Sequence, residues 1–391
     1  MPTHKIHYSA APIGSIENLA KALDFTPLFL RKVAADPTKF YTIFQKTVKQ
    51  KQRTLCEPLP VLKILQKRII SRIFCHIEFP NYLHGGIKTE EGRDFVSNAS
   101  AHAKCETALT LDIRNFFPSI TIEHVEHVFK NLFNFPPDVS ILLAKITTLK
   151  GAVPQGAPTS SYIANLVMWE KEYKLVAKLQ GRGLIYSRLI DDMTISSVKR
   201  IPEKIVTRVV DEVASMLATY SFSLHPEKKN IFSRSDPKNL MMITGLWMNR
   251  GDPRLLKQKR GEIAQNVATV EQQAKQVNAV YDMRYHKIHS AASGRVALLQ
   301  RLGHSRALRL RKILQKNEPK FDVDECNKIK ILVKKFCAKK MDSTKLNFLE
   351  NFYRYQYKIS IVKRTDPKLA KELQVMLNKK RPKTTMRDLY A

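Results

Sequence analysis

Apolar residues recur along the chain at two periods, which separate the expected helices from the expected strands. Helical spacing dominates 15–50, 61–77 and 201–220, so we predict helices over these ranges. Short runs of apolar, β-prone residues at 108–111 and 241–247 predict strands instead.

Residues 181–196 place two β-prone runs on either side of Asp191 and Asp192. This pattern predicts a tight hairpin with both carboxylates at its turn. Neighbouring carboxylates repel each other, and a hard, oxygen-seeking cation such as Mg²⁺ is the natural compensation. An Asp-Asp pair alone is more typical of ordinary turn chemistry, so its meaning depends on the motifs around it.

A third aspartate, Asp112, follows the predicted strand at 108–111. A single Asp in such a place is usually a helix or turn cap. If Asp112 faces Asp191 and Asp192 across a sheet, three carboxylates can hold two Mg²⁺ ions about 4 Å apart. One ion would lower the pKa of an attacking hydroxyl, and the other would steady a leaving pyrophosphate.

Residues that could contact a nucleotide occur before and after these aspartates in the sequence. Phe117 is expected to flank the incoming sugar and block a 2′-hydroxyl, whereas a place in the core explains Phe116 equally well. The loop at 151–161 is rich in Gly, Pro and hydroxyl residues, which let the backbone approach a ligand closely. The residues that we expect at the nucleotide are Gln155 and Gly156 beside the sugar or base, Lys228 near the leaving phosphates, and Lys51 and Arg53 as a clamp on the triphosphate.

Charge narrows the class of partner. The 391 residues include 67 Lys and Arg against 35 Asp and Glu, a net charge of +32. Such an excess favours a nucleic-acid partner over an anionic membrane surface, because binding there is driven by counterion release. The chain contains no run of 18 apolar residues and no signal-type apolar start, and its five cysteines show no CxxC spacing. We therefore expect a cytoplasmic protein with reduced thiols and no membrane partner.

The order of the motifs is more specific than any one of them. Along the chain come Asp112, the Pro-Gln-Gly loop at 154–156, the Asp-Asp hairpin, a helix, the Pro-x-Lys segment at 226–228 and a Thr-Gly strand at 244–245. This series resembles the palm of reverse transcriptases, and within them the retron-type enzymes of bacteria, over residues 45–250. Asn98-Ala99-Ser100-Ala101-His102 resembles the NAxxH element of retron enzymes, and Ile243-Thr244-Gly245 resembles their VTG element.

The resemblance implies an α+β fold of the right-hand polymerase type, with fingers, a palm built on an antiparallel sheet, and a helical thumb. It assigns N-terminal helices and fingers to 1–107 with part of 121–160, the palm to 108–250, the thumb to 251–318 and a helical extension to 319–391. Turn formers at 249–253 and 317–319 mark the last two boundaries. Residues 251–391 carry 33 Lys and Arg against 13 Asp and Glu, which gives about +20 in this part of the chain.

The resemblance also implies roles for single residues. Asp112, Ile113, Asp191 and Asp192 would form the metal site, Lys228 would act in catalysis, and Ile190 would contact the substrate. The residues expected to bind RNA are Asn98, His102, Arg295, Arg301, Arg306 and Arg309, although cationic helices that merely face solvent remain an alternative for the arginines.

In function, the resemblance implies an RNA-directed DNA polymerase that uses deoxynucleoside triphosphates. It would copy part of a structured noncoding RNA into single-stranded DNA that stays linked to the RNA, within an anti-phage defence system with an effector protein. Two alternatives remain open at this point. One is a defence-associated or intron-type reverse transcriptase without a retron RNA, and the other is a polymerase-fold RNA-binding scaffold that has lost catalysis.

Three positions depart from the family pattern. Leu189-Ile190 stands in place of the usual Tyr-Ala before the paired aspartates, Ser161 replaces a Pro, and Lys229 replaces a Thr. Ile190 is expected to alter sugar contacts and product length without abolishing synthesis. Ser161 and Lys229 are expected to be tolerated, because the expected metal ligands are all retained.

The expected place of Phe117 beside the sugar gives a first test. Phe117→Ala removes the bulk that would collide with a 2′-hydroxyl, so discrimination against ribonucleotides should relax by about 10-fold or more. Primer extension with deoxynucleotides and with ribonucleotides measures the ratio of kcat/KM values, with Phe116→Leu as the control. An unchanged ratio for Phe117→Ala would contradict the assignment.

Overall fold

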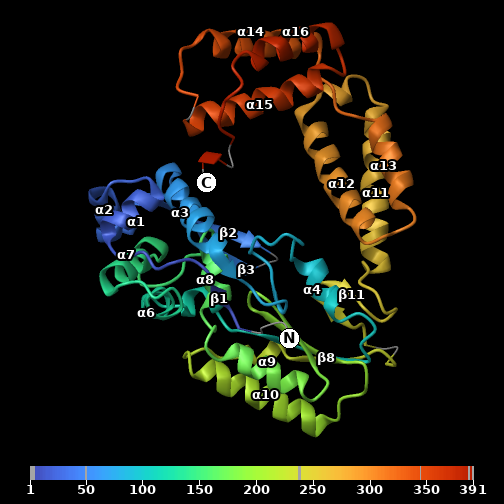
Figure 1. Cartoon of the computed structure of the whole chain (residues 1–391). Helices are drawn as coiled ribbons and strands as arrows, with labels where there is room; N and C mark the ends of the chain where they lie inside the picture. Colours follow the sequence, from blue (N-terminus) through green and yellow to red (C-terminus); the bar gives the residue numbers. More distant parts are fainter. Residues whose placement is uncertain (1–4, 49–50, 237–238, 344, 386–387, 390–391) are drawn as a thin grey trace. The chain divides into compact units, whose positions relative to one another are not determined.

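The structure is a computed structural model that describes residues 5–48, 51–236, 239–343, 345–385 and 388–389 (Figure 1). The chain divides into two compact units, one ending at Arg254 and the other running over Leu255–Leu389. This division lies close to the predicted start of the thumb at residue 251.

The first unit combines ten helices of the described chain with a central sheet. The helices are α1 (Ile16–Leu23), α2 (Pro27–Ala35), α3 (Pro60–Arg72), α4 (Phe95–Ala101), α5 (Phe116–Ser119), α6 (Ile122–His127), α7 (Pro137–Thr147), α8 (Ser160–Leu166), α9 (Glu172–Gln180) and α10 (Glu203–Ala218). One hydrophobic core extends from Ile6 to Phe222. The predicted fingers and palm segments therefore share a core.

The central sheet has the strand order β5-β7-β8-β6-β9. Its strands are β5 (Leu83–His84), β6 (Thr107–Asp112), β7 (Ile185–Leu189), β8 (Asp192–Ser197) and β9 (Asn230–Ser233). β6, β7, β8 and β9 pair in antiparallel fashion, whereas the short β5 runs parallel to β7.

The two faces of this sheet differ in chemistry because side chains alternate along each strand. Leu111 and Met193 are opposite each other in register, and both side chains are part of the hydrophobic core. Helices α8, α9 and α10 contribute side chains to the same core. The next pairs along, Thr110 with Thr194 and Asp112 with Asp192, therefore lie on the other face. One face of the sheet stabilises the fold, and the opposite face carries carboxylates and hydroxyls.

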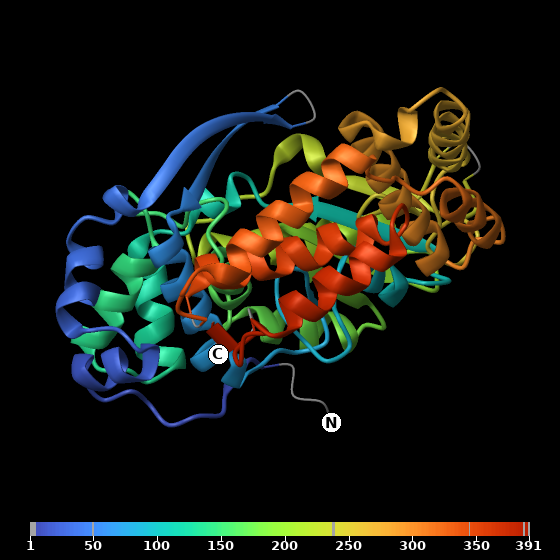
Figure 2. The ribbon, with the colours of Figure 1, turned by 90° about the horizontal axis from the view of Figure 1, so that it is seen from above.

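Two hairpins differ from the sequence prediction. Residues 15–50 were expected to be helical throughout, but β2 (Tyr41–Val48) and β3 (Lys51–Pro58) form a long two-stranded ribbon (Figure 2). The predicted single strand at 241–247 is instead a hairpin of β10 (Met242–Ile243) and β11 (Leu246–Trp247). Thr244 and Gly245 form its turn with positive φ values of 46° and 82°, as tight hairpin turns require.

Helix α4 is fastened to the polar face of the sheet by Asn98 and His102. The helix begins with a capping box between Asp94 and Ser97. The two ring nitrogens of His102 lie 2.7 Å from Ser196 Oγ and 2.6 Å from Ser187 Oγ, and Asn98 Nδ2 donates to Ser187 Oγ at 2.8 Å.

The RNA contacts predicted for Asn98 and His102 are wrong for this structure, because both side chains are 0% exposed. Burial lowers the pKa of His102 to about 3, and the nearby His84 adds to this shift, so the imidazole is neutral at pH 7. The Asn-Ala-x-x-His motif thus serves to hold α4 against β7 and β8.

The second unit is helical and contains two separate cores. Its helices are α11 (Lys257–Ala274), α12 (Met283–Arg301), α13 (Ala307–Lys316), α14 (Val323–Ala338), α15 (Leu346–Val362) and α16 (Pro367–Asn378). One core lies among α11, α12 and α13, and the other among α14, α15 and α16. The change from one core to the other falls between Leu314 and Phe321, close to the predicted boundary at residue 318.

Among the described residues, no helix combines the length and the apolar character that a membrane crossing needs.

The buried histidine of α4 gives a prediction on stability. His102→Ala removes the imidazole partner of the buried Ser196 hydroxyl and leaves Ser187 Oγ with Asn98 alone, so it should lower the free energy of unfolding by about 1–3 kcal/mol at pH 7. His102 titrates near 6.5 in the unfolded chain and near 3 when folded, so the unfolded state binds more protons between these values. Through this residue, the free energy of unfolding of the wild type should therefore fall by up to about 1.4 kcal/mol per pH unit below 6.5. The His102→Ala variant should lack this part of the pH dependence.

Urea unfolding at pH 7 and pH 5.5 measures both effects, with His76→Ala, at an exposed histidine, as the control. Equal losses of stability in the two variants would contradict a structural role for His102.

Candidate active site

The strand register brings the backbone of the three predicted aspartates together where β6 ends and β8 begins. Asp112 and Asp192 are opposite each other in the β6–β8 register, a placement that puts Cβ atoms about 5 Å apart. Ile113 N donates to Asp191 O at 3.1 Å, so the backbone of the turn is tied to the end of β6. The side chain of Ile113 is buried and apolar, so the only oxygen it can offer to a metal is its backbone carbonyl.

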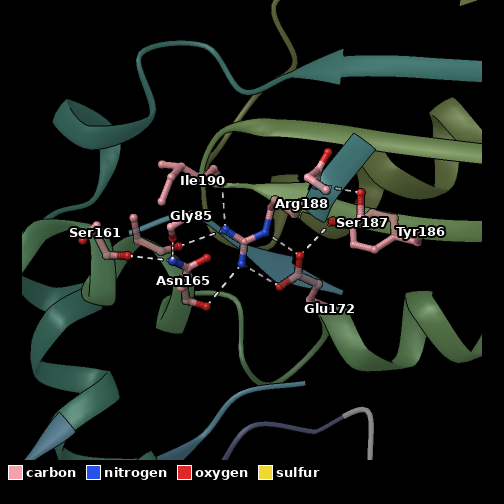
Figure 3. Close-up of polar contacts among 10 residues, drawn as sticks. Gly85, Ser161, Asn165, Glu172, Tyr186, Ser187, Arg188 and Ile190 are labelled. Atoms are coloured by element: carbon pink, nitrogen blue, oxygen red, sulfur yellow. Dashed lines mark hydrogen bonds and ion pairs between the residues drawn. The ribbon is translucent and has the colours of Figure 1, made fainter. Parts of the chain in front are cut away.

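The turn that carries Asp191 has an unusual backbone. Leu189 and Asp192 pair across it, which leaves Ile190 and Asp191 as a two-residue loop. Ile190 has a φ of +61°, a conformation that costs a β-branched residue about 1–3 kcal/mol and needs support from its surroundings. Part of this support is a hydrogen bond of 2.8 Å from Arg188 Nη1 to Ile190 O (Figure 3).

Mutual repulsion changes the electrostatics of the aspartates. Burial raises the pKa of Asp191, and the carboxylate of Asp112 raises it further. The pKa of Asp192 rises to about 7 through burial together with repulsion from Asp191 and Asp112. Asp192 keeps contact with solvent, so the neighbouring carboxylates are an essential part of this rise. The site favours bound positive charge.

Lys228 supplies one positive charge at the aspartates. Its Nζ lies 2.6 Å from Asp112 Oδ2, and it lowers the pKa of both Asp191 and Asp192. The 3-10 turn Pro226–Lys228 that carries it is attached to the end of β6, because His225 N donates to Asp112 O at 2.8 Å. The structure therefore brings the predicted lysine to the acidic centre.

An open depression of about 360 Å³ lies at the aspartates. Besides Asp112, Asp192 and Lys228, its polar lining includes Thr110, Thr194, Asn230 and Thr244. The sequence analysis did not single out the first three of these as site residues. The alternation of strand residues was the available signal, because Thr110 and Thr194 stand two positions from the aspartates and share their face.

The Gln155 loop is attached to the β2–β3 hairpin. Cys56 N donates to Gln155 O at 2.8 Å, and Gly156 has a φ of +114°. A Cβ on Gly156 would lie 2.9 Å from Cys56 O, so only glycine permits this approach. The approach places the loop beside β3, which also carries Arg53.

The other predicted nucleotide contacts have mixed outcomes. Arg53 is exposed and lowers the pKa of Asp191, so its charge acts at the acidic centre. The side chain of Lys51 lies outside the described residues. Phe117 is half-buried next to Phe116, with ring centroids 6.3 Å apart, whereas Phe116 is buried in the core.

The predicted RNA-binding arginines lie in the second unit. Arg295, Arg301, Arg306 and Arg309 are all exposed, on α12, on α13 and in the segment between them. Exposure is what a contact with phosphates requires, and it is equally compatible with cationic side chains that face solvent.

The donor set suits a hard divalent cation, because every nearby acidic donor is a carboxylate oxygen. Within the described ranges, no three acidic, imidazole or thiol side chains are placed so that together they could hold a metal ion. At Asp112 the Lys228 ammonium occupies one oxygen. The raised pKa values of Asp191 and Asp192 fit a metal, since burial first and the neighbouring carboxylates second disfavour the bare negative charge there.

Comparisons with known proteins agree with this geometry. Residues 44–279 match the family model described as reverse transcriptase (RNA-dependent DNA polymerase). The chain is 36% identical to the retron Se72 reverse transcriptase of Salmonella heidelberg (strain 579083-10), over 94% of this chain and 96% of that protein. It is 31% identical to the retron Ec48 reverse transcriptase of Escherichia coli, over 80% of this chain and 78% of that protein.

Among solved structures, apo telomerase from Candida tropicalis aligns with 86% of this chain and 67% of its own, at 11% identity and a TM-score of 0.43. A TM-score this low supports no conclusion about function. The reverse transcriptase model confirms the predicted polymerase class and implies dependence on a divalent metal. Together with the similarity to the Se72 and Ec48 enzymes over most of their length, it shows that the chain belongs to the retron reverse transcriptases and is an RNA-directed DNA polymerase.

Proposed function

We propose that this enzyme copies part of a structured noncoding RNA into single-stranded DNA that remains linked to that RNA. The observation that carries the proposal is the juxtaposition of Asp112 and Asp192 beside Lys228, in a chain similar over 94% of its length to a retron enzyme. The net charge of +32 suits a large RNA partner, because each phosphate contact releases counterions.

In this proposal Asp112, Asp191, Asp192 and the carbonyl of Ile113 hold Mg²⁺. When bound, Mg²⁺ supplies activation of the attacking hydroxyl and charge neutralisation at the pyrophosphate. In the strand register Asp112 lies opposite Asp192, and Asp191 is the turn residue just before Asp192. Side-chain rotation and release of Lys228 from Asp112 would therefore complete the donor set. Lys228 is then free to stabilise negative charge on the leaving phosphates.

Residues around the turn would orient the deoxynucleotide. Gln155 and Gly156 offer an amide and a close backbone approach, and Arg53 offers a cation near Asp191. Phe117 is half-buried, so part of its ring can meet a sugar. Ile190 presents a branched side chain at the turn itself, where the family pattern has alanine, and is proposed to contact the same sugar.

The arginines of α12 and α13 would contact the RNA through its phosphates.

An anti-phage role, with an effector protein and a cytoplasmic location, completes the proposal and rests on the resemblance to retron enzymes. Sequencing of the nucleic acid that purifies with the protein tests whether the enzyme makes DNA linked to its own RNA. A short DNA joined to a transcript of the same locus supports it, and an RNA without linked DNA favours a reverse transcriptase of another kind.

The central test removes the acidic charges. Asp191→Asn and Asp192→Asn keep the size of the side chains but remove negative charge, so DNA synthesis should fall by about 10³-fold or more while RNA binding persists. Primer extension and a filter-binding assay measure the two properties. Asp211→Asn, at an exposed aspartate of α10, is the control for loss of one charge. Synthesis at the normal rate in either site variant would refute the proposed metal ligands.

The raised pKa of Asp192 predicts how Mg²⁺ binding depends on pH. A metal ligand must be deprotonated, and Asp192 titrates near 7 without metal, so Mg²⁺ affinity should fall by up to about 10-fold per pH unit below 7. Carboxyl ¹³C chemical shifts in chelator-treated protein measure the titration. Lys228→Gln should move it to higher pH, because Lys228 lowers this pKa. Titration of Asp192 near pH 4 in metal-free protein would contradict the account.

A further inference from the structure

An ion pair between Arg188 and Glu172 is enclosed in the first unit beneath the catalytic turn. Both side chains are 0% exposed, and Arg188 is among the largest side chains that are fully buried. Arg188 Nε donates to Glu172 Oε1 at 2.6 Å and Nη2 donates to Oε2 at 2.8 Å, a two-pronged contact (Figure 3). Tyr186 Oη adds a third donor to Glu172 at 2.7 Å.

Every N–H of the Arg188 guanidinium has an acceptor. A guanidinium carries five N–H donors, and besides the two to Glu172 the others reach three backbone carbonyls. These are Ala164 O at 3.1 Å, Asn165 O at 3.2 Å and Ile190 O at 2.8 Å. The single side chain therefore connects the end of α8, the start of α9 and the turn that precedes Asp191.

The same turn is held from a second side by two glycines. A Cβ on Gly85 would lie 2.5 Å from Leu189 Cδ1, and one on Gly86 would lie 3.3 Å from Ile190 Cδ1. This close approach is fixed by α8. Ser161 Oγ donates to Gly86 O at 2.7 Å, and Asn165 Nδ2 donates to Gly85 O at 3.0 Å (Figure 3).

These contacts control the orientation of Asp191. The carbonyl of Ile190 belongs to the peptide that leads into Asp191, and the carbonyl of Asp191 accepts from Ile113 N at 3.1 Å. Both peptides that flank the aspartate are thus fastened. Ile190 at φ +61° would relax toward negative φ if its carbonyl were released, and this would turn the carboxylate away from Asp112.

We propose that Arg188, supported by Glu172, is a positioning residue that holds the strained Ile190 turn so that Asp191 and Asp192 face Asp112. Arg188 is fully buried and acts through the Ile190 carbonyl. The inference rests on the proposed roles of the three aspartates. It also explains the departures Ile190 and Ser161, because both side chains lie close to Gly86.

The test is a double-mutant cycle between Arg188→Lys and Ile190→Gly in the full-length protein. A lysine has one nitrogen and cannot reach Glu172 and Ile190 O as the planar fork does. Arg188→Lys should therefore lower kcat by about 10- to 100-fold and raise the Mg²⁺ concentration for half-maximal rate. In the Ile190→Gly background the same substitution should cost a much smaller factor, because glycine adopts positive φ without strain.

The substrate is a short RNA template with an annealed DNA primer, and thermal melting checks that each variant is folded at the assay temperature. Arg182→Lys is the matched control, because Arg182 makes a similar two-pronged contact with Glu212, at 2.9 Å for both bonds, between α9 and α10. It should leave kcat and the Mg²⁺ requirement unchanged. If Arg188→Lys does not fold, Glu172→Gln replaces it in the cycle and should shift both quantities in the same direction.

The outcomes separate the inference from the proposed function. Equal factors for Arg188→Lys in both backgrounds, or a lowered melting temperature with wild-type kcat and Mg²⁺ dependence, would overturn the positioning role alone. Absence of Mg²⁺-dependent DNA synthesis by the wild-type enzyme would overturn both. A reduced kcat with a raised Mg²⁺ requirement that Ile190→Gly relieves supports the inference.

Discussion

Like charges that face each other across two strands are the constraint on which the rest of this structure depends. The β6–β8 register places Asp112 opposite Asp192, and the turn adds Asp191 beside them. Such an arrangement destabilises the fold unless a cation compensates it. Lys228 provides part of the compensation through its ion pair with Asp112 at 2.6 Å.

The remainder of the first unit makes this arrangement possible. The apolar face of the sheet packs into a core with α8, α9 and α10, so the register is set where burial is greatest. The opposite face is closed at one end by α4 through Asn98 and His102, and it is open at the other end, where the aspartates lie. The strained turn is supported from below by Arg188 and from the side by Gly85 and Gly86.

The sequence predicted the parts of this design that local patterns encode. The Asp-Asp hairpin and the strand before Asp112 follow from runs of apolar, β-prone residues, and the order of motifs led to the correct family. It failed where the deciding partner is distant. Phe40, Ile43 and Phe44 fit a helical spacing, yet pairing with β3 makes this segment extended. The resemblance assigned the Asn98 motif to RNA, and its true partners Ser187 and Ser196 lie too far along the chain to give a local signal. Glu172 carries no local signal at all, since its importance arises from Arg188 in another element.

The most direct measurement of the central claim is a crystal structure of the enzyme with Mn²⁺, a primed RNA template and a non-reactive deoxynucleotide. Anomalous scattering locates Mn²⁺ without reference to the protein model. The account predicts Mn²⁺ bound by the carboxylates of Asp112, Asp191 and Asp192, with Lys228 Nζ displaced from Asp112. Mn²⁺ bound without these carboxylates, or Lys228 still paired with Asp112 beside the bound nucleotide, would contradict it.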